Sequence, residues 1–390
     1  MEGFEKYKLI QDENDHTIRS KNNIIQDIFK DWWEPFLEKF PFRDICKHEI
    51  AKFLLCGSKS LGYSVYECES CGNYVYVPFT CKSRFCPSCS VNSCINRSEV
   101  MPSRCLDVPH RHITFTISNF LWPFFLNDRS LLNELFDAAS YTLLSWFKQQ
   151  SKLESFSPGI IATLHTFGRD LKWNPHIHIL VTEGAIGRKT NWKVFNHFPY
   201  EMLRKRFMTK LLFNLSKRLF TSNFKKLKNF LYNENGKDFY VHAPKIHNSN
   251  FKISLAYVTR YTNRPVMAES RILDYDGEFV TYYYDRHEDG KRVVEKFHAF
   301  DFIKKLIIHI PEKGFNMVRY YGIYAMKKSV TSPFKKIKEK LTKPRKWIDK
   351  LSAHFMCNPL KCSCGNTLKF QFIVHPKSQK LFELCFPYLL

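Results

Sequence analysis

Two histidines stand one residue apart in the apolar segment "NPHIHILVTEG" at residues 174–184. Because side chains in a strand alternate between two faces, His176 and His178 would share one face, and Ile177 and Ile179 the other. The isoleucine face suits a hydrophobic core, whereas two imidazoles inside a sheet lose hydration unless something binds them. The spacing therefore predicts either hydrogen-bonded core histidines or two ligands of one metal ion.

A third histidine, His165, lies in "TLHTFG" on the strand that we expect just before this segment. If the two strands pair as a hairpin, His165 can lie beside His176 and His178 as a third ligand. Three protein ligands leave coordination positions open, as a catalytic metal requires. The alternative is that His165 is an ordinary strand residue.

Two tyrosines stand four residues apart in "AYVTRYTNR", and Arg260 and Arg264 flank them. On a helix, Tyr257 and Tyr261 would share one face. Taken alone, this spacing is typical of core aromatic residues. Beside a histidine metal site, however, a phenol could attack phosphorus, although its pKa of about 10 makes it a weak nucleophile without a divalent cation.

The segment "CESCGNYVYVPFTCKSRFCPSCSVNSC" contains two Cys-x2-Cys pairs. Cys68 with Cys71 and Cys86 with Cys89 are separated by 14 residues (72–85). This spacing predicts one structural Zn²⁺ held by the four thiolates. Two further cysteines could replace one of these ligands, join a second site or simply be buried beside the metal; they are Cys81 and Cys94.

A smaller cysteine group stands near the C-terminus in "CNPLKCSCG". Its cysteines are Cys357, Cys362 and Cys364, and only the last two form a close pair. Because this pair is Cys-x-Cys rather than Cys-x2-Cys, the sequence argues against a second zinc site.

The 390-residue chain is 44% hydrophobic and 16% aromatic, which indicates a folded protein of one to three domains. No apolar run is long enough to cross a bilayer, and the acidic N-terminus lacks a secretory pattern. We therefore expect a cytoplasmic protein, in which thirteen cysteines ligate metal rather than form disulfides.

The net charge of +23 is concentrated in two windows. Residues 201–250 carry 11 Lys/Arg against 3 Asp/Glu and residues 301–350 carry 14 against 4, which gives 8 + 10 = 18 of the 23 charges. Basic stretches interleaved with aromatic residues are typical of nucleic-acid-binding proteins, the alternative being a solvated basic surface.

The predicted elements alternate strands and helices and favour an α+β fold around an antiparallel sheet flanked by helices. We expect helices over 20–61, 130–150, 201–231 and 298–309, and strands over 110–118, 159–184, 238–246, 266–284 and 315–325. The sequence suggests three domains: a helical and zinc-binding part (1–105), a catalytic domain (106–330), and a basic linker with a small cysteine-containing tail (331–390).

The histidine strand followed by Tyr-x3-Tyr resembles the HUH single-strand endonucleases. More closely, the chain resembles the two-tyrosine rolling-circle transposases of bacterial insertion sequences, which carry an N-terminal zinc-binding domain. Similar segments occur in order from about residue 45 to 365, including "HTFGRDLKWNPHIHILVTEG", "YVTRYTNRPVMAESRI" and "IPEKGFNMVRYYGIYA". Two departures from the family pattern are Asn174-Pro175, where His-Pro is expected, and Cys362-x-Cys364, where Cys-x2-Cys is expected.

The resemblance implies a DNA transposase that cleaves and rejoins single-stranded DNA through 5′-phosphotyrosine intermediates at Tyr257 and Tyr261. It further implies that His176, His178 and His165 hold Mg²⁺ or Mn²⁺. The partners would be single-stranded DNA and the terminal hairpins of the element, on the nucleoid. The expected DNA-contacting residues are Arg260, Arg264, Arg319, Tyr320 and Tyr321.

Two other interpretations stay open. A plasmid rolling-circle replication initiator or relaxase would use the same chemistry for a different outcome. A non-enzymatic, zinc-containing nucleic-acid-binding protein would use the histidines and tyrosines only structurally. The absence of a G-x4-G-K-[ST] loop fits strand transfer, because a covalent phosphotyrosine conserves the bond energy without ATP.

Overall fold

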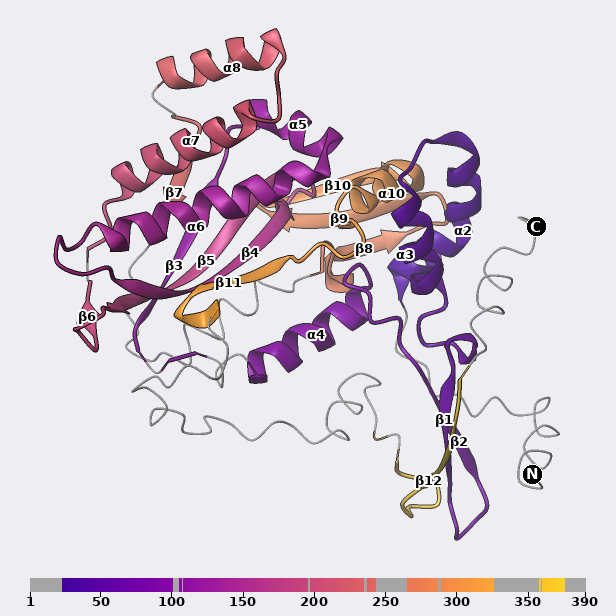
Figure 1. Ribbon diagram of the computed structural model, residues 1–390. Helices are drawn as coiled ribbons and strands as arrows, with labels where there is room; N and C mark the ends of the chain where they lie inside the picture. Colours follow the sequence, from indigo (N-terminus) through magenta and orange to yellow (C-terminus); the bar gives the residue numbers. More distant parts are fainter. Residues whose placement is uncertain are drawn as a thin grey trace.

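The computed structural model describes residues 23–100, 105–106, 108–195, 197–234, 237–242, 265–286, 289–325, 358 and 360–375. At its centre lies a six-stranded antiparallel sheet with the order β11-β4-β5-β3-β7, in which β6 also pairs with β5 (Figure 1). Its strands are β3 (His110–Thr116), β4 (Ser157–Phe167), β5 (Trp173–Ile186), β6 (Lys193–Val194), β7 (Tyr240–His242) and β11 (Val318–Gly322).

Helices α6 (Leu132–Lys148) and α7 (Tyr200–Ser216) cover one face of this sheet (Figure 1). The apolar side chains of β5, including Ile177 and Ile179, are fully buried against them, as the alternation of the sequence predicts. The short helix α5 (Trp122–Asn127) lies at one end of this layer. One face of the sheet is thus a hydrophobic core, and the histidines are on the other.

The single helix predicted over residues 201–231 is wrong, because the chain forms two helices, α7 and α8 (Ser222–Asn233). Thr221 begins α8: its side chain accepts a hydrogen bond from the backbone N–H of Phe224 at 3.2 Å. A threonine in this position satisfies a backbone donor that has no partner inside the helix, which favours a helix start there. The apolar periodicity continues across the break and conceals it.

A second hydrophobic core joins the N-terminal helices to a segment more than 200 residues later. Helices α2 (Ile24–Lys39) and α3 (Asp44–Leu54) pack with α10 (Ala299–Ile307) and with a three-stranded antiparallel sheet of β8 (Ile272–Tyr275), β9 (Phe279–Asp285) and β10 (Arg292–His298). Phe29, Phe53, Tyr282 and Phe302 are fully buried in this core. Residues on both sides of the predicted boundary at 105 therefore contribute to one core.

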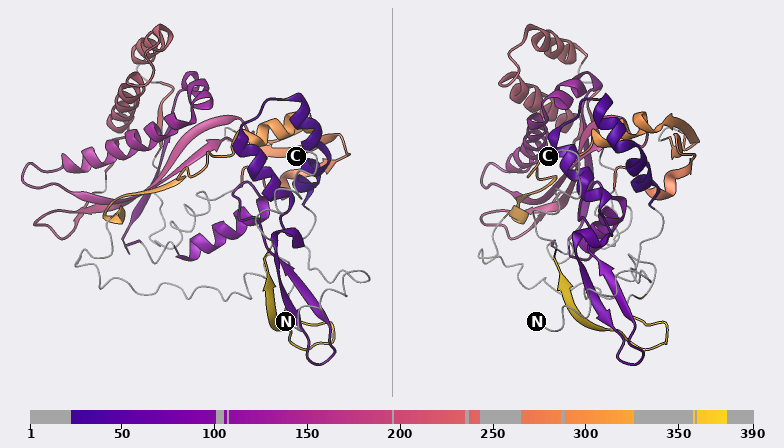
Figure 2. Two further views of the ribbon diagram at one scale, coloured as in Figure 1. Left: turned by 45° about the vertical axis from the view of Figure 1, so that its right-hand side comes forward. Right: turned by 90° about the vertical axis from the view of Figure 1, so that its right-hand side faces the viewer.

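The third part is a hairpin of β1 (Tyr63–Glu67) and β2 (Tyr74–Pro78) that projects from the rest of the molecule, as Figure 2 shows from two directions. The tail strand β12 (Lys369–Val374) pairs antiparallel with β1. Helix α4 (Pro87–Val100) follows the hairpin. This architecture confirms the predicted α+β class with antiparallel sheets flanked by helices.

Among the described residues, no helix combines the length and the apolar character that a bilayer crossing requires.

Candidate active site

The structure brings the three predicted histidines together on the face of the sheet opposite α6 and α7. Strands β4 and β5 form the predicted hairpin, and His165 pairs directly with His176 in its register. One ring nitrogen from each of His165, His176 and His178 lies within 4.8 Å of those of the other two. Their juxtaposition agrees with the prediction, whereas their binding of a metal stays a prediction.

The motif Asn174-Pro175 sets the orientation of His176. The register of β4 and β5 shifts between His165 and Phe167, because β5 carries one extra residue there, beside Asn174 and Pro175. Proline has no N–H to donate to a ladder, so a bulge is a position in a sheet that tolerates it. The carbonyl oxygen of Asn174 lies 2.7 Å from Nδ1 of His176. That contact holds the proton on Nδ1 and leaves Nε2 of His176 available as a ligand.

His178 is held by the neighbouring strand β3 in the same manner. Its Nδ1 lies 2.9 Å from Nε2 of His112 and 3.2 Å from Oγ1 of Thr114. The sequence reasoning missed His112, although the alternation of "HRHITFTIS" already placed it on the same strand face as Thr114. A hydrogen-bond partner on the other ring nitrogen fixes the tautomer and the orientation of a ligating imidazole.

The arrangement fits a metal ion chemically. Burial lowers the pKa of His176, and burial together with the neighbouring imidazoles holds the pKa of His178 well below its usual value. Both rings are therefore neutral near pH 7, which is the form that binds metals. The Nε2 atoms of His176 and His178 are 3.1 Å apart. For metal–nitrogen bonds of about 2.1 Å, two adjacent ligands of a six-coordinate ion are separated by about 3 Å.

A cavity beside His165 lies between the histidine strands, the start of α4 and the end of α10. It is lined by His165, by Phe85 and Ser90 around the start of α4, by Val266, and by His309 just after α10. The histidine site therefore adjoins the segment that carries Cys86 and Cys89.

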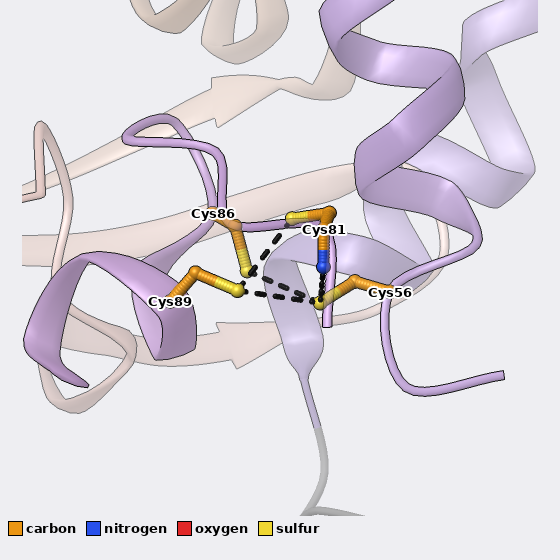
Figure 3. Close-up of side chains that lie close together, drawn as sticks. All are labelled: Cys56, Cys81, Cys86 and Cys89. Atoms are coloured by element: carbon orange, nitrogen blue, oxygen red, sulfur yellow. Dashed lines mark hydrogen bonds between the residues drawn. The ribbon is translucent and has the colours of Figure 1, made fainter. Parts of the chain in front are cut away.

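Four cysteines form one compact group, Cys56, Cys81, Cys86 and Cys89 (Figure 3). The Sγ atom of Cys89 lies 3.6 Å from those of Cys56 and Cys81, and the Sγ atoms of Cys86 and Cys56 are 3.7 Å apart. With zinc–sulfur bonds of about 2.3 Å, the sulfurs of a tetrahedral site are about 3.8 Å apart. The group therefore has the composition and the spacing of a structural zinc site.

The predicted zinc site of Cys68, Cys71, Cys86 and Cys89 is wrong in its grouping, because Cys68 and Cys71 belong to a second group with Cys362 and Cys364. Cys68 and Cys71 follow β1 at the tip of the hairpin, whereas Cys81 to Cys89 follow β2 at its base. Five-residue strands separate tip and base by about 16 Å. The fold thus places the tail pair Cys362 and Cys364 beside Cys68 and Cys71, a grouping that the spacing of the tail cysteines alone does not reveal.

Of the remaining cysteines, Cys94 lies on α4 outside both groups, and Cys357 lies outside the described residues. The sequence left Cys81 open as a replacement ligand, a member of a second site or a buried neighbour of the metal, and its spacing gave no signal for Cys56. One sequence signal for the second group was available: the tripeptide Cys-Gly-Asn occurs at residues 71–73 and again at 364–366.

The tyrosines Tyr257 and Tyr261 and the arginines Arg260 and Arg264 lie outside the described residues. The predicted strand "RYYG" is confirmed as part of β11. The guanidinium of Arg319 stacks over the ring of Phe136 at 4.1 Å and donates a hydrogen bond to Oδ1 of Asn133, both on α6.

The other two predicted DNA contacts on β11 point to opposite faces of the sheet. Tyr321 packs against the core beneath α6. Tyr320 packs instead with Ile161 and Leu180, which share the strand face of the histidines. Each of these three β11 residues therefore has contacts inside the protein, and their contact with DNA stays a prediction.

Comparison with known proteins agrees with this architecture. A protein-family model described as "Putative transposase" matches residues 159–331, and one described as "Transposase zinc-binding domain" matches residues 28–117. The transposase for insertion sequence element IS801 of Pseudomonas savastanoi pv. phaseolicola is 32% identical over 310 residues, which cover 75% of this chain and 73% of the relative. The chain belongs to the IS91 family of insertion-sequence transposases.

A more distant relative of this transposase is "Putative transposase y4qJ" of Sinorhizobium fredii (strain NBRC 101917 / NGR234), 24% identical over 317 residues, or 76% of this chain and 79% of the relative. No solved structure matches the transposase significantly. The three histidines and both tyrosines lie within the matched range 159–331, and Cys56 to Cys89 lie within 28–117. Cys362 and Cys364 lie outside both ranges. The family and the zinc-binding domain that the sequence predicts are thereby confirmed.

Proposed function

We propose that this transposase cleaves and rejoins single-stranded DNA at the ends of its insertion sequence, using Tyr257 and Tyr261 as nucleophiles beside a metal ion held by His165, His176 and His178. The observation that carries the proposal is the convergence of three imidazoles on one face of the central hairpin. A core histidine needs a hydrogen-bond partner for each of its two ring nitrogens, and that need does not require two further histidines beside it.

Hydrogen bonds within the chain orient two of these rings so that they can bind Mg²⁺ or Mn²⁺. Asn174 and the pair His112 and Thr114 occupy the Nδ1 atoms of His176 and His178, so the Nε2 atoms face each other. A bound divalent cation would supply charge neutralisation and orientation of the scissile phosphate. Imidazole ligands favour Mn²⁺, and cellular abundance favours Mg²⁺.

The described residues on either side of the tyrosines in the sequence support a position near this site. On the N-terminal side of the tyrosines, His242 pairs with Thr114 on β3. On their C-terminal side, Val266 lines the cavity beside His165. Val266 follows Tyr261 by five positions (266 − 261 = 5). Such a length reaches at most about 18 Å. A position for Tyr261 near the histidines is compatible with this length, which supports the proposal; Tyr257, nine positions from Val266 (266 − 257 = 9), has a longer reach.

In the proposed reaction a tyrosine oxygen attacks phosphorus and forms a P–O bond while the bond from phosphorus to the 3′-oxygen breaks. The proton lost by the phenol is balanced by the proton that the leaving 3′-oxygen gains. The products are a 5′-phosphotyrosine and a free 3′-OH, and attack by a 3′-OH reverses the step. Two tyrosines allow two strand ends to be held in turn.

Basic and aromatic residues would bind the DNA. Helices α7 and α8 carry most of the first basic window, and Tyr320 lies on the histidine face of the sheet. Positive charge along the backbone and aromatic stacking on the bases suit single-stranded DNA and the terminal hairpins of an element. Arg260 and Arg264 flank the tyrosines in the sequence and complete the proposed contacts.

The first cysteine group would act structurally. A zinc ion bound by Cys56, Cys81, Cys86 and Cys89 would fix the start of α4. Ser90 in this helix and Phe85 just before it line the cavity beside His165. The zinc-binding domain would in this way support both the recognition of DNA ends and the shape of the active site. A plasmid replication initiator or relaxase would share this chemistry, but the family relationship favours transposition.

The test is cleavage of a single-stranded oligonucleotide that spans the end of the insertion sequence, with Mn²⁺ present. The wild-type protein should nick it, and EDTA should stop the reaction. His176→Ala and His178→Ala should abolish nicking yet retain DNA binding in a gel-shift assay, because the dispersed basic contacts remain. An unchanged nicking rate in His176→Ala would contradict the proposal. An oligonucleotide left intact by the wild-type protein as well as by the variants would also contradict it, and would favour a non-enzymatic DNA-binding protein.

A further inference from the structure

Two turns far apart in the sequence share the tripeptide Cys-Gly-Asn and corresponding hydrogen bonds, the first turn being one residue longer than the second. The first turn contains Cys71-Gly72-Asn73 and the second Cys364-Gly365-Asn366. In the first, the Cys68 N–H donates to the carbonyl of Asn73 at 2.8 Å, and Gly72 N–H donates to the carbonyl of Cys68 at 2.8 Å. In the second, Cys362 N–H donates to Asn366 at 2.8 Å, and Gly365 N–H to Cys362 at 2.9 Å.

The glycines make these turns possible. Gly72 has φ +70° and Gly365 has φ +90°, a conformation that residues with a Cβ rarely adopt. In both turns the chain folds back so that two cysteine side chains point to the same side, and a strand follows the asparagine: β2 in one case and β12 in the other. The structure thus contains two matching cysteine turns, one on the hairpin and one on the tail.

These turns face each other. The Sγ atoms of Cys68 and Cys364 are 3.6 Å apart, those of Cys71 and Cys362 are 3.5 Å apart, and all four lie within 4.8 Å of one another. These separations are far longer than a disulfide bond of about 2.05 Å. They are close to the edge of about 3.8 Å that four sulfurs have around a zinc ion.

The protein contacts around this site are modest. The buried cluster beside it consists of Tyr66, Cys68, Val77, Cys362 and Leu368, and strands β1, β2 and β12 form a three-stranded sheet. Three short strands over so small a core are marginally stable without a further link. A metal that joins residues almost 300 positions apart removes much chain entropy from the unfolded state.

We propose that Cys68, Cys71, Cys362 and Cys364 bind a second structural Zn²⁺, which fixes the C-terminal tail to the projecting β1–β2 hairpin. Each turn supplies half of the ligands, so neither the hairpin nor the tail can form the site alone. The proposal does not depend on the nuclease chemistry of the histidine site. It also extends past the matched zinc-binding domain, which ends at residue 117.

Zinc content of the purified full-length protein tests this directly. Elemental analysis by mass spectrometry should find about two zinc ions per chain in the wild type and about one in the double variant Cys362→Ser/Cys364→Ser. A matched control, Cys94→Ser, removes a thiol outside both groups and should retain two. One zinc or none in the wild type, or two in the double variant, would overturn the proposal. Two disulfides in place of the metal, seen as a mass lower by four hydrogens, would also overturn it.

Hydrogen exchange covers the case in which the double variant fails to fold. In wild-type protein, amides of residues 369–374 should be protected while two zinc ions are bound. Stepwise removal of zinc with a chelator should release the ion at the exposed Cys71 and Cys364 first. Protection of 369–374 should be lost with that first ion, while the core around α2 and α10 stays protected. Full protection of β12 in protein that has lost both ions would refute the role of the metal.

Discussion

His112 offers a quantitative test of how the histidine site is assembled. When Nε2 of His178 serves as a ligand, its Nδ1 carries the proton and donates either to His112 Nε2, 2.9 Å away, or to Thr114 Oγ1, 3.2 Å away. Loss of a hydrogen-bond partner of a ligating imidazole typically weakens metal binding by about 10- to 100-fold. Since Thr114 remains in the variant His112→Leu, we predict the lower limit, a Kd for Mn²⁺ about tenfold higher, or about 1.4 kcal/mol.

The double variant His112→Leu/Thr114→Val removes both acceptors and should approach the upper limit of about 100-fold. Calorimetric titration with Mn²⁺, in the absence of DNA, measures the affinity without reference to cleavage. His112→Gln restores an acceptor oxygen and should recover most of the affinity. His197→Gln is the matched control, because His197 is exposed between β6 and α7. An unchanged Kd in the double variant, or equal weakening in the Leu and Gln variants, would refute the reasoning.

Three further predictions concern the scaffold. Cys56→Ser should lower zinc content by about one ion per chain and reduce solubility, measured together by elemental analysis and sedimentation, and unaltered zinc would contradict the Cys56 group. Burial lowers the pKa of His309 to about 3, so unfolded chains gain protons first below pH 6.5 and stability is lost as pH falls. His309→Gln should therefore reduce the drop in unfolding free energy between pH 7 and pH 5 by about 2 kcal/mol in denaturant titrations, and an equal drop would refute this. Glu183→Gln should cost about 3 kcal/mol in the same assay, because buried Arg111, 2.6 Å from Glu183, loses its charged partner, and a neutral effect would contradict that.

Local patterns in the sequence were sufficient for the histidine site. The alternation around His176 and His178 required only that the segment be a strand, and a short connection to the preceding strand brought His165 opposite His176. Such features depend on neighbours in the chain, so periodicity and turn chemistry predict them. His112 required the pairing of β3 with β5, which the alternation of one strand does not reveal.

The cysteine sites could not be assigned in this way. Two Cys-x2-Cys pairs 14 residues apart are compatible with one shared zinc. In the fold the two pairs lie apart, because the hairpin places Cys71 at its tip and Cys86 beyond its base. Cys56 stands at the end of a helical stretch and reads as a small core residue, while Cys362 is 291 positions from its neighbour Cys71. Contacts over such distances are determined by tertiary packing rather than by spacing.

The central claim is that tyrosines on this chain become covalently joined to DNA at the histidine site. Wild-type protein should be incubated with Mn²⁺ and a labelled single-stranded oligonucleotide from the end of the element, then boiled in detergent and separated by electrophoresis. A phenol that displaces the 3′-oxygen retains the phosphate. The adduct should therefore carry DNA through its 5′ end.

Tyr257→Phe/Tyr261→Phe removes both hydroxyls, and the account predicts no adduct from this variant together with wild-type zinc content and Mn²⁺ affinity. At least one single variant should still nick while transposing poorly, since in the proposed reaction the two nucleophiles hold two strand ends in turn. Peptide mapping of the wild-type adduct decides the matter most directly. The predicted result is DNA on Tyr257 or Tyr261; DNA on another residue such as Tyr283 or Tyr320, or no adduct under conditions in which nicking occurs, would contradict the account.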